Sequence, residues 1–493
     1  MHCSPTKVRA GNLEIVRESI DARKKPDVKL VYTVDVDVEG KLPFEEAVRE
    51  TYVPVPASAT DDMAQPVIVG FGPCGIFAAL ILAEAGKRPI VLERGKAVEE
   101  RVEDVRRFQS GETDAPDPES NVQFGEGGAG TFSDGKLTTG IRDIRIRKVL
   151  EEFVAAGADP EILYKQKPHI GTDRLQEIVR NLRRRIEELG GEVRFGCRME
   201  DIMTETEADG RQRLKGVRIR RTGAATEEGA LPEIEELTAD AVILATGHSA
   251  RDTFRMLYDK GAVMEKKPFS IGVRIEHPQE IINKAQYGDP ALAEIIGPAD
   301  YKLNHRCGNG RGVYTFCMCP GGVVINASTE ARTQVTNGMS NSARDGAYAN
   351  SGLLVDVRTS DLEEHPLAGI EFQRRYEKLA WENKAVSTYG AFRDDAADPV
   401  RKSLPGFAAD AILEAMPHLG RKLQGFDRED AKMTAVESRS SSPVRILRDE
   451  KMQSSIRGLI PAGEGPGYAG GIMSAAVDGI KAAEQVLLSK NHR

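Results

Sequence analysis

The amino-acid sequence predicts an α/β fold in which one parallel β-sheet is assembled from distant parts of the chain. Residues 65–94 have the pattern of a strand, a glycine turn, a helix and a second strand. Residues 240–247 form a short apolar run that ends at a glycine, and residues 458–488 repeat the order of strand, glycine-rich loop and helix. Short apolar runs between helical patterns are typical of buried parallel strands, so the three segments should share one sheet.

The composition excludes several classes of protein. The chain has 493 residues, of which 40% are hydrophobic and 29% are charged, and its formal net charge is −8. This acidity argues against a nucleic-acid or membrane surface, and no apolar run approaches the ~20 residues of a membrane span. The six cysteines are scattered and the N-terminus has no apolar signal core, which predicts reduced thiols and a cytoplasmic location.

The first segment carries a dinucleotide-binding fingerprint. The six residues Gly70–Gly75 follow a buried strand, open a helix and have the spacing GxGxxG. In this pattern the first glycine permits a tight turn, the second lets the backbone approach a pyrophosphate, and the third lets the helix pack on the strand. Glu93 ends the next strand, where a carboxylate accepts hydrogen bonds from the adenosine ribose, and Arg94 could neutralise nearby charge. We therefore expect a dinucleotide to contact Gly70, Gly72, Pro73, Cys74, Gly75, Glu93 and Arg94.

The far end of the chain indicates FAD among the dinucleotides. Its strand, glycine-rich loop and helix resemble the second flavin motif of the glutathione-reductase-like FAD proteins. The resemblance implies that Glu464 binds the ribityl chain. It also implies that the helix start at Gly470, Gly471 and Ile472 faces the flavin, where the helix dipole stabilises the reduced form. Further cofactor contacts are implied at Met199, Thr246, Gly247 and Gly463.

A closer resemblance covers the chain from about residue 14. On several segments the chain resembles a bacterial group of uncharacterised FAD-dependent dehydrogenases or oxidoreductases, which carry a small N-terminal domain, a split FAD domain and a distinctive further domain. The chain departs from this group in its short N-terminus and in Cys74, where alanine is more usual. The segments are SIDARKK at 19–25, NVQFGEGGAGTFSDGKL at 121–137, HIGTD at 169–173, FCMCPGG at 316–322, NGMS at 337–340, ESRSSSPVR at 437–445 and GEGPGYAGGI at 463–472.

These motifs also divide the chain. We predict a small α+β N-terminal domain at residues 1–60, with a half-buried strand at 30–38. A Rossmann-type FAD-binding domain begins with residues 61–261 and is completed by residues 431–493. An α+β substrate-side domain at 262–430 is inserted between these two parts, as the topology of the resembled fold requires.

A second glycine cluster, at Phe124–Lys136, has no buried strand before it, so we expect no second nucleotide fold there. We predict a loop that wraps the flavin and directs backbone N–H groups at it; a plain glycine-rich surface loop is the alternative. Lys136 would lie near the ring and stabilise reduced flavin by its charge. The cofactor contacts expected on this side are Arg101, Gly128, Gly130 and Thr131.

The candidates for catalysis are His248, Lys136 and Cys317. His248 follows the strand beside the cofactor and could act as an acid or base, as could His169, although a lone histidine is more often structural. Cys317 and Cys319 form a CxC pair. We favour small buried residues before a Pro-Gly-Gly turn, and a thiol near the flavin is the alternative.

The sequence leaves the roles of two further groups of residues open. Cys307, His305 and His277 lack the spacing of metal ligands, so we expect no metal. Arg439 and Arg445 flank a run of serines. These residues could hold a carboxylate or phosphate of a substrate, or could cap a loop.

Together the motifs predict an FAD-dependent oxidoreductase of the dehydrogenase type, which passes a hydride between an unidentified organic substrate and flavin N5. No second complete dinucleotide fold is visible, so NAD(P)H as electron donor would have to dock transiently. The alternatives are a flavin-dependent monooxygenase, or a flavoprotein with an RNA-binding or partner-binding role whose first 60 residues form the docking module. We expect a small-molecule substrate and neither a membrane nor a nucleic-acid partner; the oligomeric state is open.

Overall fold

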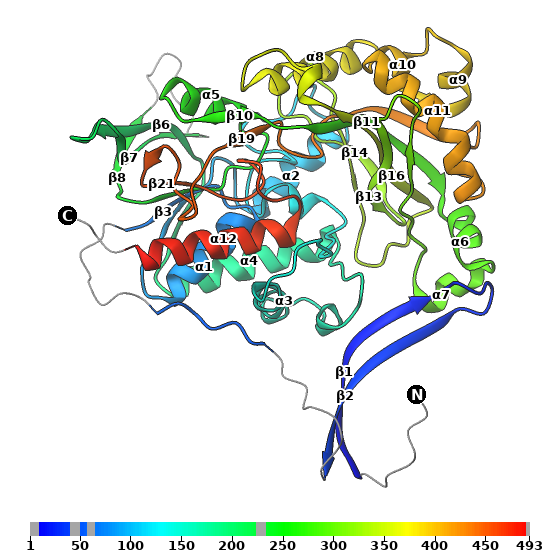
Figure 1. Cartoon of the computed structure of the whole chain (residues 1–493), viewed down its shortest axis with the longest axis horizontal. Coiled ribbons are helices and arrows are strands. Elements are labelled where there is room, and N and C mark those ends of the chain that lie inside the picture. Colours follow the sequence, from blue (N-terminus) through cyan, green and yellow to red (C-terminus); the bar gives the residue numbers. More distant parts are fainter. Residues whose placement is uncertain (1–8, 40–49, 57–64, 223–232, 490–493) are drawn as a thin grey trace.

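The structure confirms the α/β class. The computed structural model describes residues 9–39, 50–56, 65–222 and 233–489, which form two adjoining domains and an N-terminal β-ribbon that extends away from them (Figure 1). The domain at the left of Figure 1 contains the expected parallel sheet, and the domain at the right is built on an antiparallel sheet. Among the described helices, none is both long and apolar enough to cross a membrane.

A five-stranded parallel sheet forms the centre of the first domain, in the order β21–β9–β3–β4–β5. The strand from the end of the chain lies two places from the strand before the first glycine turn, which brings the two glycine motifs together. All residues of β9, β3 and β4 are buried, because both faces of the sheet are covered. The strands are β3 (Val67–Val69), β4 (Ile90–Leu92), β5 (Glu192–Arg194), β9 (Val242–Leu244) and β21 (Leu459–Pro461).

Helices cover one face of this sheet, and a smaller, mostly antiparallel sheet covers the other. The helix after the first glycine turn, α1, packs against α12, the last helix. Their contact is so close that a Cβ on Gly479 would lie 2.1 Å from the carbonyl oxygen of Cys74. The elements are α1 (Pro73–Glu84), α2 (Val98–Gln109), α3 (Arg145–Ala155), α4 (Thr172–Glu188), α5 (Arg251–Asp259), α12 (Ile472–Leu488), β6 (Cys197–Thr206), β7 (Gln212–Arg221), β8 (Ile234–Thr238) and β20 (Ile456–Arg457).

The second domain is built on a six-stranded antiparallel sheet in the order β12–β13–β16–β11–β18–β17. Strand β18 pairs with the central β11 although it lies beyond residue 430, so this sheet extends past the boundary that we predicted. The strands are β11 (Phe269–Pro278), β12 (Asn304–Arg306), β13 (Gly312–Cys319), β16 (Tyr348–Val357), β17 (Val386–Thr388) and β18 (Lys432–Glu437), with the pairs β10 (Met264–Lys266) and β19 (Val444–Ile446), and β14 (Val323–Asn326) and β15 (Thr336–Met339). The helices are α6 (Gln279–Tyr287), α7 (Ala293–Ile296), α8 (Ala368–Glu382), α9 (Tyr389–Asp394), α10 (Pro399–Lys402) and α11 (Gly406–Lys422).

The N-terminal region differs from the prediction. Its described residues form an antiparallel ribbon of β1 (Arg9–Asp21) and β2 (Lys29–Glu39), and no helix precedes α1 among them, whereas residues 1–8, 40–49 and 57–60 of the predicted α+β domain lie outside the described residues. The expected half-buried strand is mostly exposed, because the ribbon packs against the body of the protein mainly at its turn end, beside α6 and α7 (Figure 1). Backbone hydrogen bonds join Glu18 to Tyr164 and Gln166, each at 2.9 Å. The exposed apolar side chains include Leu13, Ile15, Ile20, Leu30, Tyr32, Val34 and Val36.

Candidate active site

A cavity of about 850 Å³ lies where the two domains meet. One wall consists of loops at the carboxyl ends of the parallel strands, where α/β proteins bind their ligands. The opposite wall belongs to the antiparallel sheet of the second domain. The volume is within the range of ligand pockets in proteins. The predicted residues that line it are Gly70, Gly72, Pro73, Cys74, Glu93, Arg94, Gly128, Gly130, Lys136, Met199, Thr246, Gly247, His248, Cys317, Glu464, Gly470, Gly471 and Ile472.

The three glycines of the first turn have different roles. Gly70 has a φ of +100°, and a Cβ there would lie 2.4 Å from the carbonyl oxygen of Ala245. A Cβ on Gly75 would lie 1.9 Å from the carbonyl oxygen of Gly70, so both positions are required by the packing of the protein itself. Gly72 faces the cavity, and the nearest atom to a Cβ there would be the Cα of Gly128 at 3.7 Å. The space in front of Gly72 is therefore available to a ligand.

Other glycines also expose their backbone to the cavity. A Cβ on Gly247, Gly470 or Gly471 would meet no atom within 4 Å, and all three residues line the cavity. Gly471 caps α12 without any side-chain hydrogen bond to the N–H groups of the first turn. Free N–H groups and open space at a helix start suit an electronegative ligand edge. These residues fit a flavin dinucleotide as the sequence predicts.

Glu93 links the two glycine loops. Its Oε2 accepts the N–H of Phe71 at 2.8 Å, and its Oε1 accepts the N–H groups of Gly95 and Gly125, each at 2.9 Å. A carboxylate has about four acceptor sites, so one oxygen can still accept a ribose hydroxyl from the cavity. Arg94 beside it stacks on the ring of Phe124 at 4.2 Å and lines the same end of the cavity.

Four predicted contacts lie behind the cavity wall. Arg101 is fully buried, and its guanidinium donates to the carbonyl oxygens of four residues in the segment 121–128. It therefore shapes the second glycine loop from beneath. The hydroxyl of Thr131 donates to the carbonyl oxygen of Glu126 within that loop. Gly75 and Gly463 allow close packing, since a Cβ on Gly463 would lie 2.9 Å from that of Cys74.

Lys136 joins the glycine loop to the second domain. Its ammonium donates to the carbonyl oxygen of Met318 and lies 3.9 Å from a carboxylate oxygen of Asp134. Asp134 is buried and also pairs with Arg344. The ammonium thus holds two walls of the cavity together, in addition to placing a positive charge beside Cys317. His169 does not line the cavity, and its Nε2 lies 3.1 Å from the carbonyl oxygen of Ser342.

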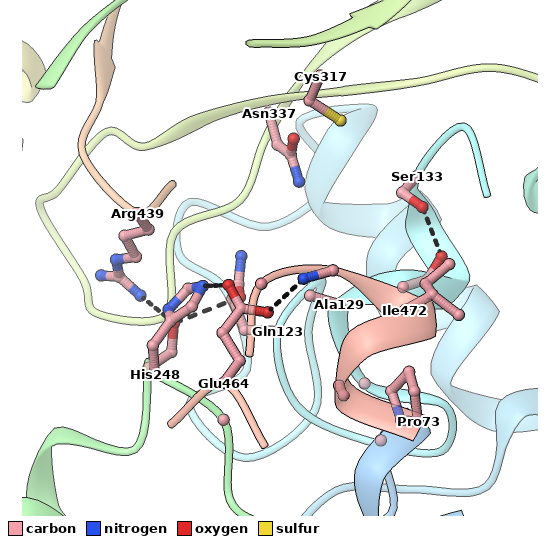
Figure 2. A pocket seen from close by; sticks show the side chains of 18 of the residues that line it. Pro73, Gln123, Ala129, Ser133, His248, Cys317, Asn337, Arg439, Glu464 and Ile472 are labelled. Carbon is pink, nitrogen blue, oxygen red and sulfur yellow. Dashed lines mark hydrogen bonds and ion pairs between the residues drawn. The ribbon is translucent and has the colours of Figure 1, made fainter. Parts of the chain in front are cut away.

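His248 and Glu464 point toward each other, with Cys317 and Asn337 on the opposite wall (Figure 2). The Nε2 of His248 lies 3.6 Å from Oε1 of Glu464, whose other oxygen accepts the N–H of Gly471 at 3.4 Å. Burial raises the pKa of Glu464 to about 7. Burial and the neighbouring cation of Arg439 lower the pKa of His248 to about 3. At neutral pH the titrating proton of this pair therefore belongs to Glu464, and His248 is the neutral partner.

This assignment predicts a pH-dependent effect of Glu464→Gln. An acid whose pKa is raised by folding stabilises the protein at low pH, and that contribution is lost as the pH rises through about 7. Glutamine stays neutral, so the variant should melt above the wild type near pH 8, by an amount that shrinks toward about pH 5. Thermal unfolding of flavin-free protein across this range measures the difference. An offset that does not change with pH would contradict the assignment.

A buried ion network behind His248 joins Arg439 of the arginine–serine segment to Glu377 and Arg251, which lie outside the sequence motifs. Glu377 of α8 is fully buried and accepts hydrogen bonds from Arg251 and Arg439 at 2.7–3.0 Å. Arg439 also donates to Ser249 Oγ at 3.2 Å and lines the cavity. The Arg439 guanidinium is thus already paired with a protein carboxylate. It positions the loop that carries His248.

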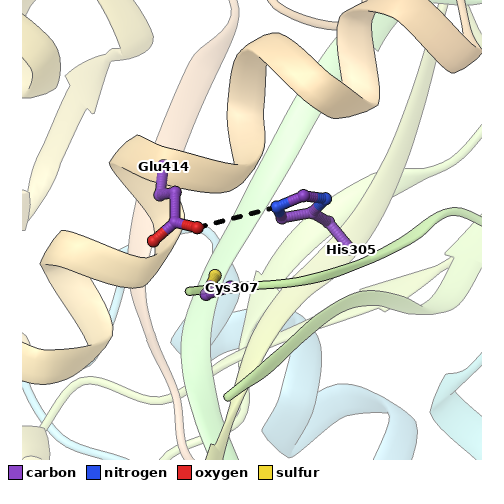
Figure 3. Close-up of side chains that lie close together, drawn as sticks. All are labelled: His305, Cys307 and Glu414. Carbon is purple, nitrogen blue, oxygen red and sulfur yellow. Dashed lines mark ion pairs between the residues drawn. The ribbon is translucent and has the colours of Figure 1, made fainter. Parts of the chain in front are cut away.

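A second group of ligand-type side chains lies outside the cavity. His305, Cys307 and Glu414 each offer one atom within 4.8 Å of the other two, and Figure 3 shows Glu414 of α11 directed at His305. His277 is not part of this group, since it is buried with its Nε2 2.7 Å from the carbonyl oxygen of Phe426. The group could hold a metal ion. None of its three residues lines the cavity.

Comparison with known proteins agrees with this site. Residues 268–398 match a family model described as FAD-dependent protein, C-terminal domain-like, and residues 1–37 match a domain of unknown function, DUF8436. The description of the first matching family agrees with the cavity, and together they support FAD as the cofactor. An uncharacterized protein of Clostridium beijerinckii is 43% identical, with a match that covers 98% of this chain and 93% of that protein. The chain belongs to the same family as this protein.

Solved structures resemble the chain only distantly. A geranylgeranyl bacteriochlorophyll reductase-like protein from Thermoplasma acidophilum is 14% identical, with a TM-score of 0.38 over 86% of this chain and 77% of that one. CtdE in complex with FAD is 14% identical, with a TM-score of 0.32 over 86% and 83% of the two chains. The flavin-dependent brominase Bmp2 is 14% identical, with a TM-score of 0.38 over 86% and 80%. Likenesses at this level do not indicate a shared reaction.

Proposed function

We propose that this protein is an FAD-dependent oxidoreductase of the dehydrogenase type, which transfers a hydride between an organic substrate and flavin N5. The observation that carries the proposal is a cavity with two kinds of wall. Glycine turns and helix starts of the parallel-sheet domain form one wall, and polar side chains of the antiparallel sheet form the other. The first wall suits a dinucleotide, and the second leaves room for a substrate beside it.

Different residues of the chain would bind the cofactor, hold a proton and contact the substrate. The turn at Gly70–Gly75, with Glu93, would hold the pyrophosphate and ribose, and the start of α12 would hold the flavin edge. FAD, when bound, supplies two-electron chemistry at N5. Glu464 would hold a proton beside the flavin edge, and neutral His248 would orient the Glu464 carboxyl group. Substrate would lie against the wall of Thr315, Asn337 and Glu437 in the second domain.

The test is the spectrum and flavin content of the purified protein. We expect an oxidised-flavin spectrum and about one FAD per chain, released on denaturation because the binding is non-covalent. Protein that neither contains FAD nor takes it up would contradict the proposal. Reaction of the reduced protein with air separates the subtypes: slow reoxidation supports a dehydrogenase, and rapid reoxidation through an oxygen adduct would replace that subtype with a monooxygenase.

A further inference from the structure

The CxC pair interrupts strand β13 at the cavity. Phe316 pairs with Gly352 and Cys319 pairs with Asn350, so β13 advances three residues between these pairs while β16 advances two. One extra residue therefore bulges out of the ladder. Cys317 has a φ of +42°, a left-handed conformation that is uncommon for a residue with a Cβ and that is often found at functional sites.

The bulge brings the two thiols together. In a regular strand, residues two apart advance about 6.6 Å, which is near the upper limit for Cα atoms joined by a disulfide. Here the thiol of Cys319 donates to the carbonyl oxygen of Cys317 at 3.3 Å, which places its sulfur next to Cys317. Cys317 lines the cavity and is partly exposed, whereas Cys319 is fully buried behind it.

The charges around the pair favour one thiolate. The hydrogen bond from Cys319 and the nearby cations of Arg274 and Lys136 lower the pKa of Cys317. The pKa of Cys319 is raised by the same hydrogen bond and by burial. Arg274 is fully buried, and its Nη1 donates to the carbonyl oxygen of Cys317 at 2.9 Å. An accessible nucleophilic sulfur beside a protonated resolving thiol is the arrangement of a redox-active pair.

We propose that Cys317 and Cys319 form a dithiol–disulfide pair that exchanges two electrons with the flavin of the same cavity. The inference rests on the proposed function, because oxidised FAD is the electron acceptor. The S–S bond forms between the Cys317 thiolate and Cys319 as the S–H bond of Cys319 breaks. Two electrons and that one proton pass to oxidised FAD, which becomes the reduced flavin monoanion, so that charge and atoms balance. In reverse, reduced flavin returns the pair to thiolate and thiol.

The first experiment measures the reactivity of individual cysteine thiols and does not require enzymatic turnover of a substrate. Native protein is treated briefly with iodoacetamide near neutral pH and its alkylated peptides are identified by mass. We expect Cys317 to react at least about tenfold faster than the buried Cys74 and Cys307, since the thiolate is the nucleophile. After mild oxidation, the peptides of Cys317 and Cys319 should be blocked and linked. Equal slow alkylation of all these cysteines, with no linked product, would overturn the proposal.

The second experiment counts electrons in the flavin-containing protein. Anaerobic reductive titration of the oxidised wild type should consume about four electrons per FAD, two for the flavin and two for the disulfide. Cys317→Ser and Cys319→Ser should each consume about two. Two electrons in the wild type would overturn the pair while leaving the flavin intact. Absence of flavin from every variant would instead contradict the proposed function.

Discussion

Replacing Gly72 with valine should abolish FAD binding in a chain that still folds. Gly72 has φ −81° and ψ −174°, an extended conformation that any residue adopts. The nearest atom to its Cβ would be at 3.7 Å, an ordinary contact. The valine side chain would occupy the space that the pyrophosphate needs. We expect FAD to bind at least about 100-fold more weakly, equivalent to about 2.7 kcal/mol, as measured by titration of the flavin-free protein.

A glycine outside the cavity provides the matched control. Gly406 begins α11, and a Cβ there would meet nothing within 4 Å. Gly406→Val should therefore bind FAD as the wild type does, and both variants should unfold cooperatively. If Gly72→Val retained a full complement of FAD, the turn would not be the pyrophosphate site. The cavity would then have to hold its ligand elsewhere.

Replacing Glu377 with glutamine should be among the most destabilising single changes in the chain. The carboxylate is fully buried between Arg251 and Arg439, which hold its pKa well below its usual range. Glutamine keeps the shape but leaves two buried guanidinium groups without their shared counter-charge. Removing one partner of a buried ion pair typically costs about 3–5 kcal/mol. Denaturant unfolding of wild type and variant at neutral pH measures this loss.

The same helix supplies the control for this change. Glu371, also on α8, has a side chain that is 57% exposed and lies 3.2 Å from Arg374. Glu371→Gln should cost less than about 1 kcal/mol, because exposed ion pairs contribute little. Glu377→Gln should also disturb the loop of His248, since Arg439 bonds Ser249 beside it. Equal unfolding midpoints for the two variants would contradict the role of the buried network.

Local patterns predicted one wall of the cavity well. The turn residues Gly70 and Gly72, and the helix start at Gly470 and Gly471, line it as expected. Their positions follow from backbone geometry alone, because a strand that ends in a glycine turn and opens a helix leaves N–H groups at the edge of the sheet. The position of Arg101 behind this wall could not be predicted, because the sequence shows a charge but not its burial. Its guanidinium faces four carbonyl oxygens inside the protein.

The sequence by itself determined the α/β class, the glycine turn after the first strand and the return of the last helix to the first. Each of these depends on residues that are neighbours in the chain, where periodicity and glycine placement act directly. Only the tertiary structure decided that Glu464 meets His248, that Glu377 serves two distant arginines, and that a bulge joins Cys317 to Cys319. These arrangements depend on burial and on contacts between remote segments, which set charge and reactivity but leave no local pattern.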